Sequence, residues 1–102
     1  MKNKIPIQVP KDKIRIFCKK YHVKKLSFFG SMLRNDFSAD SDLDVLIEFQ
    51  PNQKIGYLDM ARMEEELSAI MNKKVDLRTP AELSRYFRQE VLENAEVQYA
   101  EG

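Results

Sequence analysis

Hydrophobic residues recur at helical spacing in three parts of the chain. Behind Pro10, which suits a first helical turn, the apolar positions predict a helix near residues 10–21. A second such pattern runs from about residue 57 to residue 71 and would be ended by Asn72. A third begins at Thr79-Pro80-Ala81-Glu82, a segment that can form a capping box, so we expect a long final helix there. Its apolar face would comprise Leu83, Tyr86, Phe87, Val91 and Leu92.

Three short segments between these helices are rich in residues that favour strands, namely residues 25–30, 43–49 and 74–78. The resulting order predicts an α+β protein with two layers, in which helices pack on a small mixed three-stranded sheet. A chain of 102 residues is long enough for one hydrophobic core. We therefore expect residues 1–102 to form a single domain, with residues 1–9 as a flexible basic arm.

The composition is typical of a soluble globular protein, with 43% hydrophobic and 32% charged residues. No apolar run approaches the ~20 residues that span a bilayer, so we expect no membrane contact. The segment after Met1 lacks the apolar core of an export signal. Cys18 is the only cysteine, which excludes an internal disulfide and fits a cytoplasmic protein.

Positive charge is concentrated at the start of the chain. Residues 1–25 hold nine Lys or Arg against one Asp, a balance of +8, so the other 77 residues together carry −7. A basic segment of this kind can contact RNA or an acidic protein surface. A solvated helix face that carries lysines explains the same pattern, and we favour it over a nucleic-acid site.

Two aspartates stand at the start of the segment 43–49. Because strand side chains alternate, Asp42 and Asp44 project from one face, about 7 Å apart at Cα, while Leu43 and Val45 take the other face. Two carboxylates ~4 Å apart repel by about 4 kcal/mol at an effective dielectric of ~20. A metal ion or solvent must offset this repulsion, and such a pair can converge on a hard cation.

The segment Val75-Asp76-Leu77 adds a third carboxylate. Its two apolar residues face inward, which turns Asp76 to the opposite face. If this strand lies beside the strand 43–49, three carboxylates meet at one place, and their charge suits two magnesium ions. The simpler alternative is that Asp76 forms a salt bridge with Lys73 or Arg78.

A candidate phosphate-binding turn, Gly30-Ser31, lies ten residues before Asp42. Glycine allows the backbone to approach a phosphate closely, and the following N–H groups and the Ser31 hydroxyl can bind it at a helix start. Arg34, one turn further on, could neutralise a phosphate oxygen. Each of these signals is weak alone, and their order along the chain makes them specific.

The pattern Gly30-Ser31-x10-Asp42-x-Asp44, with Asp76 as third carboxylate, resembles the DNA polymerase β-like nucleotidyltransferase superfamily. More narrowly, the chain is similar to minimal nucleotidyltransferase (MNT) domains, which act as antitoxins to HEPN ribonuclease toxins. The similarity extends over about residues 10–100. The sequence departs from many relatives at Leu33-Arg34-Asn35, where a small residue and then Arg-Gly are common. The similarity to MNT domains rests on the segments 29–34, 41–49, 75–77 and 79–80.

The resemblance implies a polymerase β-like fold and a transfer of AMP from ATP, with Mg²⁺, to a tyrosine of a HEPN toxin in a hetero-oligomer. By resemblance, Gly30 and Ser31 hold the triphosphate, Asp42 and Asp44 bind both metal ions, and Asp76 completes one metal site and helps to activate the nucleophile. Three alternatives stay open: an antitoxin that only occludes its partner, a transferase that acts on RNA ends, and one that acts on a small molecule. Three intact aspartates favour the enzyme.

Two substitutions distinguish a phosphate-binding turn from an ordinary one. Ser31→Ala removes one hydroxyl contact, whereas Gly30→Val blocks the close approach of the backbone, so we expect the larger loss of ATP affinity for Gly30→Val. Equilibrium binding of labelled ATP measures this order. If Gly30→Val binds ATP as tightly as the unaltered protein, the assignment is wrong.

Overall fold

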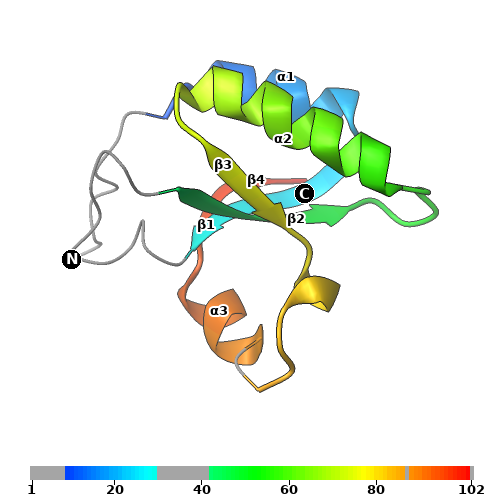
Figure 1. The fold of residues 1–102 in the computed structure, drawn as a ribbon, viewed down its shortest axis with the longest axis vertical. Helices are drawn as coiled ribbons and strands as arrows, with labels where there is room; N and C mark the ends of the chain where they lie inside the picture. The colour runs from blue at the N-terminus through cyan, green and yellow to red at the C-terminus, as the bar shows by residue number, and fades with distance from the viewer. Residues whose placement is uncertain (1–8, 30–41, 87, 102) are drawn as a thin grey trace.

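The computed structural model describes residues 9–29, 42–86 and 88–101. Figure 1 shows α1 and α2 side by side over one face of a sheet, with α3 on the opposite side. None of the helices that these residues form is long and apolar enough to cross a membrane. In chain order the elements are α1 (Lys11–Lys20), β1 (Val23–Phe29), β2 (Leu43–Phe49), α2 (Tyr57–Met71), β3 (Val75–Arg78), the 3-10 helix η2 (Pro80–Glu82), α3 (Arg88–Asn94) and β4 (Glu96–Ala100).

The strands lie in the order β3-β2-β1-β4. β1 runs antiparallel to both of its neighbours, and β3 runs parallel to β2. A parallel pair cannot be closed by a tight turn, and here α2 makes the crossover. This helix begins after Gly56, whose N–H donates to Asp59 over 3.1 Å, and it ends at Asn72, which takes a left-handed conformation with φ 53°. The predicted bounds of α2 are thereby confirmed.

The hydrophobic core lies between the sheet and the pair α1 and α2. Leu43, Val45 and Ile47 of β2 are fully buried against Met63 and Leu67 of α2. From α1, the residues Ile14, Phe17 and Cys18 complete this core. Burial raises the pKa of the Cys18 thiol to about 12, so this cysteine is an inert part of the packing.

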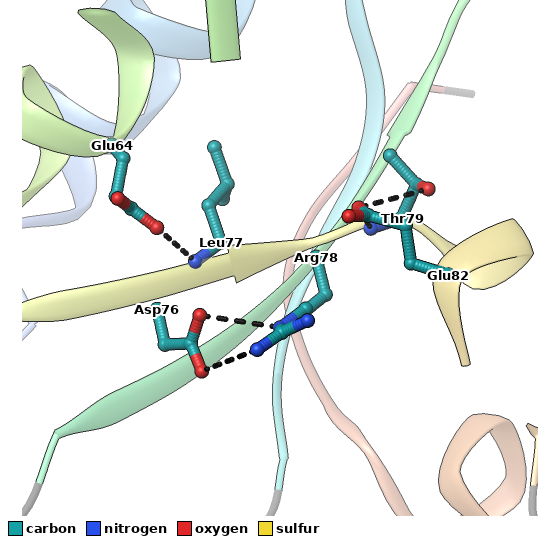
Figure 2. Close-up of polar contacts among 6 residues, drawn as sticks. All are labelled: Glu64, Asp76, Leu77, Arg78, Thr79 and Glu82. Atoms are coloured by element: carbon teal, nitrogen blue, oxygen red, sulfur yellow. Dashed lines mark hydrogen bonds and ion pairs between the residues drawn. The ribbon is translucent and has the colours of Figure 1, made fainter. Parts of the chain in front are cut away.

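Side chains of α2 satisfy the outer edge of β3. The N–H of Val75 donates to the hydroxyl of Ser68 over 2.9 Å. The N–H of Leu77 donates to the carboxylate of Glu64 over 2.8 Å (Figure 2). The Ser68 hydroxyl in turn donates to the backbone carbonyl of Glu64 over 2.7 Å. An edge strand normally presents such donors to solvent or to another chain. In this protein the crossover helix binds them, which ties β3 to α2 along its length.

The end of the chain corrects two predictions. The sheet formed by the described residues has four strands, because residues 96–100 form β4 beside β1 rather than continuing a helix. The long final helix is also wrong: η2 covers only three residues and α3 only seven. Tyr86, which we expected on an apolar helix face, precedes α3 and is 92% exposed. The expected basic arm falls almost wholly in residues 1–8, outside the described residues.

The α2–β3 attachment predicts a loss of stability in Ser68→Ala. The substitution leaves the buried N–H of Val75 without this acceptor, so we expect the free energy of unfolding to fall by about 1–2 kcal/mol. Alanine is the better helix former by up to ~0.5 kcal/mol, so a more stable variant would contradict the attachment. Urea unfolding gives the difference.

Ser84→Ala is the matched control for this measurement. The Ser84 hydroxyl accepts a 3.3 Å hydrogen bond from the N–H of Tyr86 in an exposed turn. Because water can replace an exposed acceptor, we expect a change within about 0.5 kcal/mol.

Candidate active site

The parallel pairing of β2 with β3 brings two of the predicted carboxylates together. In its register, Asp44 lies opposite Asp76, between the apolar pairs Leu43–Val75 and Val45–Leu77. Neighbouring strands are about 4.8 Å apart, and both aspartates leave the face turned away from α1 and α2. Their half-buried side chains contrast with the buried apolar residues on either side.

Asp42 lies at the rim of this pair. It directly precedes β2 and is exposed. The next residue, Leu43, is held in the sheet by a 2.9 Å hydrogen bond from its N–H to the carbonyl of Lys74. The backbone of Asp42 is therefore positioned by its neighbour Leu43, the first residue of β2.

The Asp76 carboxylate is engaged by Arg78, two residues further along β3 and on the same face. Arg78 Nε lies 3.2 Å from Asp76 Oδ1, and Arg78 Nη2 lies 3.4 Å from Oδ2 (Figure 2). The hydrogen bond to Asp76 and the charge of Asp76 raise the pKa of Arg78, and the charges of Glu82 and Asp44 raise it further. Of the two salt-bridge partners considered for Asp76, Arg78 is the one that the structure shows.

This ion pair is weak because water reaches both partners. The side chain of Arg78 is 47% exposed and that of Asp76 is 36% exposed. Ion pairs at this level of exposure contribute about 0–1 kcal/mol, since solvent screens the attraction and two side chains lose freedom. Arg78 therefore offsets part of the repulsion between Asp44 and Asp76, and its own contact with Asp76 can open at a small energetic cost.

The strand β3 leads directly into a short cap that positions Glu82. One carboxylate oxygen of Glu82, Oε1, accepts from the N–H of Thr79 over 2.8 Å and from the Thr79 hydroxyl over 3.2 Å. Figure 2 shows this cap immediately beyond Arg78. The sequence motif Thr79-Pro80-Ala81-Glu82 thus caps a helix start as predicted, although the helix that follows is only η2.

The predicted phosphate-binding residues Gly30, Ser31 and Arg34 lie outside the described residues. The described chain does fix where their segment begins. β1 ends at Phe29, which is paired with Asp44 on the side of β2 away from β3. Phe29, the last described residue before Gly30, therefore lies next to Asp44.

The carboxylates fit a magnesium ion in their donor chemistry. Among the described residues, no group of three or more His, Cys, Asp or Glu side chains is arranged to hold a metal ion. Magnesium does not require such a cage, because it usually takes one or two carboxylates together with waters and substrate phosphates. Asp44 and Asp76 offer that number of hard oxygen ligands, and Asp42 stands beside them.

A hollow of about 480 Å³ lies apart from the three aspartates. It opens between the start of α2 and η2, and its lining includes Tyr57, Met60, Leu77 and Thr79. Leu77 faces the helix side of the sheet, whereas Asp76 faces the opposite side. The hollow is thus a separate feature of the surface.

Residues 11–97 match the nucleotidyltransferase domain family, and the chain therefore belongs to this family and is a nucleotidyltransferase. An archaeal relative from Methanocaldococcus jannaschii, provisionally named a protein adenylyltransferase, is 34% identical over 85 residues, which cover 83% of this chain and 89% of the relative. The resemblance to this class of enzyme is confirmed.

Two solved structures share the fold. A crystal structure of a toxin–antitoxin with AMP-PNP superposes with a TM-score of 0.72 at 16% identity, over 91% of this chain and 75% of that one. A complex of a tri-AMPylated Shewanella oneidensis HEPN toxin with its MNT antitoxin gives a TM-score of 0.64 at 16% identity, over 89% and 70% of the two chains. At this identity the likeness establishes the minimal nucleotidyltransferase fold.

Sequence reasoning missed two residues that shape the site, Glu64 and Ser68. Arg78 was considered as a salt-bridge partner of Asp76, and the structure shows that contact. The alternation of β3 already places Arg78 on the face of Asp76, so that signal was available. No sequence signal predicts that Glu64 and Ser68 bind the backbone of β3, because this contact depends on how α2 lies against the strand.

The opposition of Asp44 and Asp76 predicts a loss of metal binding in Asp44→Asn and Asp76→Asn. Each variant removes one anionic ligand, so we expect at least tenfold weaker Mn²⁺ binding in the presence of AMP-PNP, with the thermal unfolding midpoint retained. Electron paramagnetic resonance of free Mn²⁺ gives the affinity. Asp12→Asn is the control, because it removes the same charge from an 89% exposed side chain on α1. Equal affinities in all four proteins would exclude the metal site.

Proposed function

We propose that this chain transfers AMP from ATP, with Mg²⁺, to a tyrosine of a HEPN-type toxin and thereby acts as its antitoxin. The observation that carries the proposal is the register of β2 and β3, which sets Asp44 directly opposite Asp76 in a member of the nucleotidyltransferase family. Carboxylates that share one sheet face are the arrangement that nucleotidyl transfer with two metal ions needs.

In this proposal each side chain has a defined role. Asp42 and Asp44 would hold both magnesium ions, and Asp76 would complete one of the two sites and orient the acceptor hydroxyl. Gly30 and Ser31 would hold the triphosphate with their N–H groups and the Ser31 hydroxyl. Bound magnesium would supply positive charge to the attacking and leaving oxygens.

The reaction would be a substitution at the α-phosphorus of ATP. The tyrosine oxygen forms a bond to this phosphorus, the bond from the phosphorus to the bridging oxygen breaks, and pyrophosphate leaves. The proton of the hydroxyl passes to Asp76 or to solvent. This chain contributes position and charge rather than a covalent intermediate, which is the usual division of work in phosphoryl transfer.

The relatives support a protein acceptor. The M. jannaschii relative is provisionally named a protein adenylyltransferase, and one structural neighbour is bound to an AMPylated HEPN toxin. The neighbour with AMP-PNP supports an adenine nucleotide as donor. A cytoplasmic location is part of the same proposal, because ATP, magnesium and a reduced lone cysteine all fit that compartment.

The decisive experiment separates enzymatic transfer from occlusion. Incubate a purified HEPN toxin with this protein, ATP and Mg²⁺, and then measure the intact mass of the toxin. We expect the mass to rise in steps of one AMP and the repurified toxin to stay inactive as a ribonuclease. We expect no mass change with the Asp42→Asn/Asp44→Asn double variant, because the clamp on the phosphates is lost.

Asp12→Asn should modify the toxin at the rate of the unaltered protein. An unmodified toxin that regains ribonuclease activity after separation would overturn the transfer and favour occlusion. The same conclusion would follow if the double variant protects as fully as the unaltered protein.

A further inference from the structure

Arg78 occupies the carboxylate that the proposed function assigns to magnesium. Two guanidinium nitrogens contact the two oxygens of Asp76, at 3.2 Å and 3.4 Å, so both oxygens are engaged at once (Figure 2). A side-by-side contact of this kind is specific to arginine, because the planar guanidinium matches the spacing of a carboxylate. A metal ion that coordinates Asp76 must displace at least one of these contacts.

We propose that Arg78 is a positioning residue that holds Asp76 while no metal is bound and releases it when magnesium and nucleotide arrive. The inference rests on the proposed function, since it presupposes a metal site at Asp44 and Asp76. Arg78 thus competes with the metal ion for one ligand of the site.

The surroundings of the guanidinium make this exchange feasible. Arg78 is about half exposed, so solvent can take over its hydrogen bonds as the pair opens. Glu82 and Asp44 also act on its charge, so the side chain remains near the acidic face when it leaves Asp76. If a triphosphate binds beside this face, its oxygens can accept the hydrogen bonds of Arg78 in place of Asp76, which completes the exchange of partners.

The attachment of β3 to α2 keeps the exchange local. The backbone of β3 is bonded to Ser68 and Glu64 on its outer edge, on either side of Asp76. Loss of the Arg78 contact therefore changes the side chain of Asp76 and not the position of its strand. A purely structural role of Arg78 would predict the opposite, namely that its removal weakens the metal site.

The test measures Mn²⁺ binding without nucleotide, by electron paramagnetic resonance, in the unaltered protein and in three variants. Arg78→Gln should bind Mn²⁺ about two- to fivefold more tightly, a size set by the small contribution of an exposed ion pair. Arg78→Lys keeps the charge but cannot make both contacts, so its affinity should rise toward that of Arg78→Gln. Arg62→Gln removes the same charge from an exposed site on α2 and should bind as the unaltered protein does.

Each outcome decides the inference. Weaker Mn²⁺ binding in Arg78→Gln would show that the residue only supports the site. If Arg78→Lys binds Mn²⁺ as the unaltered protein does, the effect of Arg78→Gln comes from charge alone. This result would contradict a competition between the guanidinium and the metal ion for Asp76. Asp76→Asn, measured in parallel, separates the two proposals: if it binds Mn²⁺ as tightly as the unaltered protein, the metal site itself has failed. If Asp76→Asn binds Mn²⁺ weakly, the metal site is supported, and the Arg78 variants then test whether Arg78 exchanges with the metal ion.

Discussion

The site depends on one contact between neighbours in the sheet, the parallel pairing of β3 with β2. A shift of this register by one residue would turn Asp76 into the core and expose Val75 or Leu77 in its place. The register is set from two sides. Burial of Val75 and Leu77 fixes which face of β3 turns inward, and the hydrogen bonds from β3 to Ser68 and Glu64 fix its position along α2. The crossover helix thus determines which carboxylates meet.

Bringing like charges together is unfavourable, and the fold limits the penalty in two ways. At ~5 Å and an effective dielectric of ~20, two carboxylates repel by about 3 kcal/mol. Both side chains are only partly buried, so solvent screens the pair, and Arg78 lies beside it with its charge directed at Asp76. A domain of this size has a free energy of unfolding of only about 5–15 kcal/mol, so a fully buried pair would be hard to tolerate. An accessible, partly neutralised pair is compatible with both stability and ligand binding.

Local patterns predicted those parts of the fold whose residues carry strong alternation or strong helical spacing. The predicted bounds 43–49 of β2 and 57–71 of α2 agree with the structure. The signals for both elements are local in the sequence: the spacing of apolar residues, and an asparagine at residue 72 that takes the left-handed conformation. β4 was missed, since Glu96 and Gln98 give it a polar character and only pairing with the distant β1 makes it a strand. The spacing of the apolar residues before and after residue 87 predicted one continuous helix, whereas the structure has two short helices, η2 and α3. For the site, alternation predicted the shared face of Asp44 and Asp76, but not that Arg78 would engage both oxygens of the carboxylate.

The way in which α2 holds β3 has a consequence for how this protein can change over time. Ser68 and Glu64 recognise backbone N–H groups, which every residue except proline presents, and they make no demand on the side chains of residues 76 and 78. The side chains on the Asp76 face of β3 can therefore be exchanged while the strand keeps its place. A lineage that lost Asp76 would keep the folded scaffold, and an acid regained at this position would again lie opposite Asp44. In this four-residue strand, the contacts that hold the backbone lie along the outer edge, whereas the side chains of Asp76 and Arg78 lie on one face.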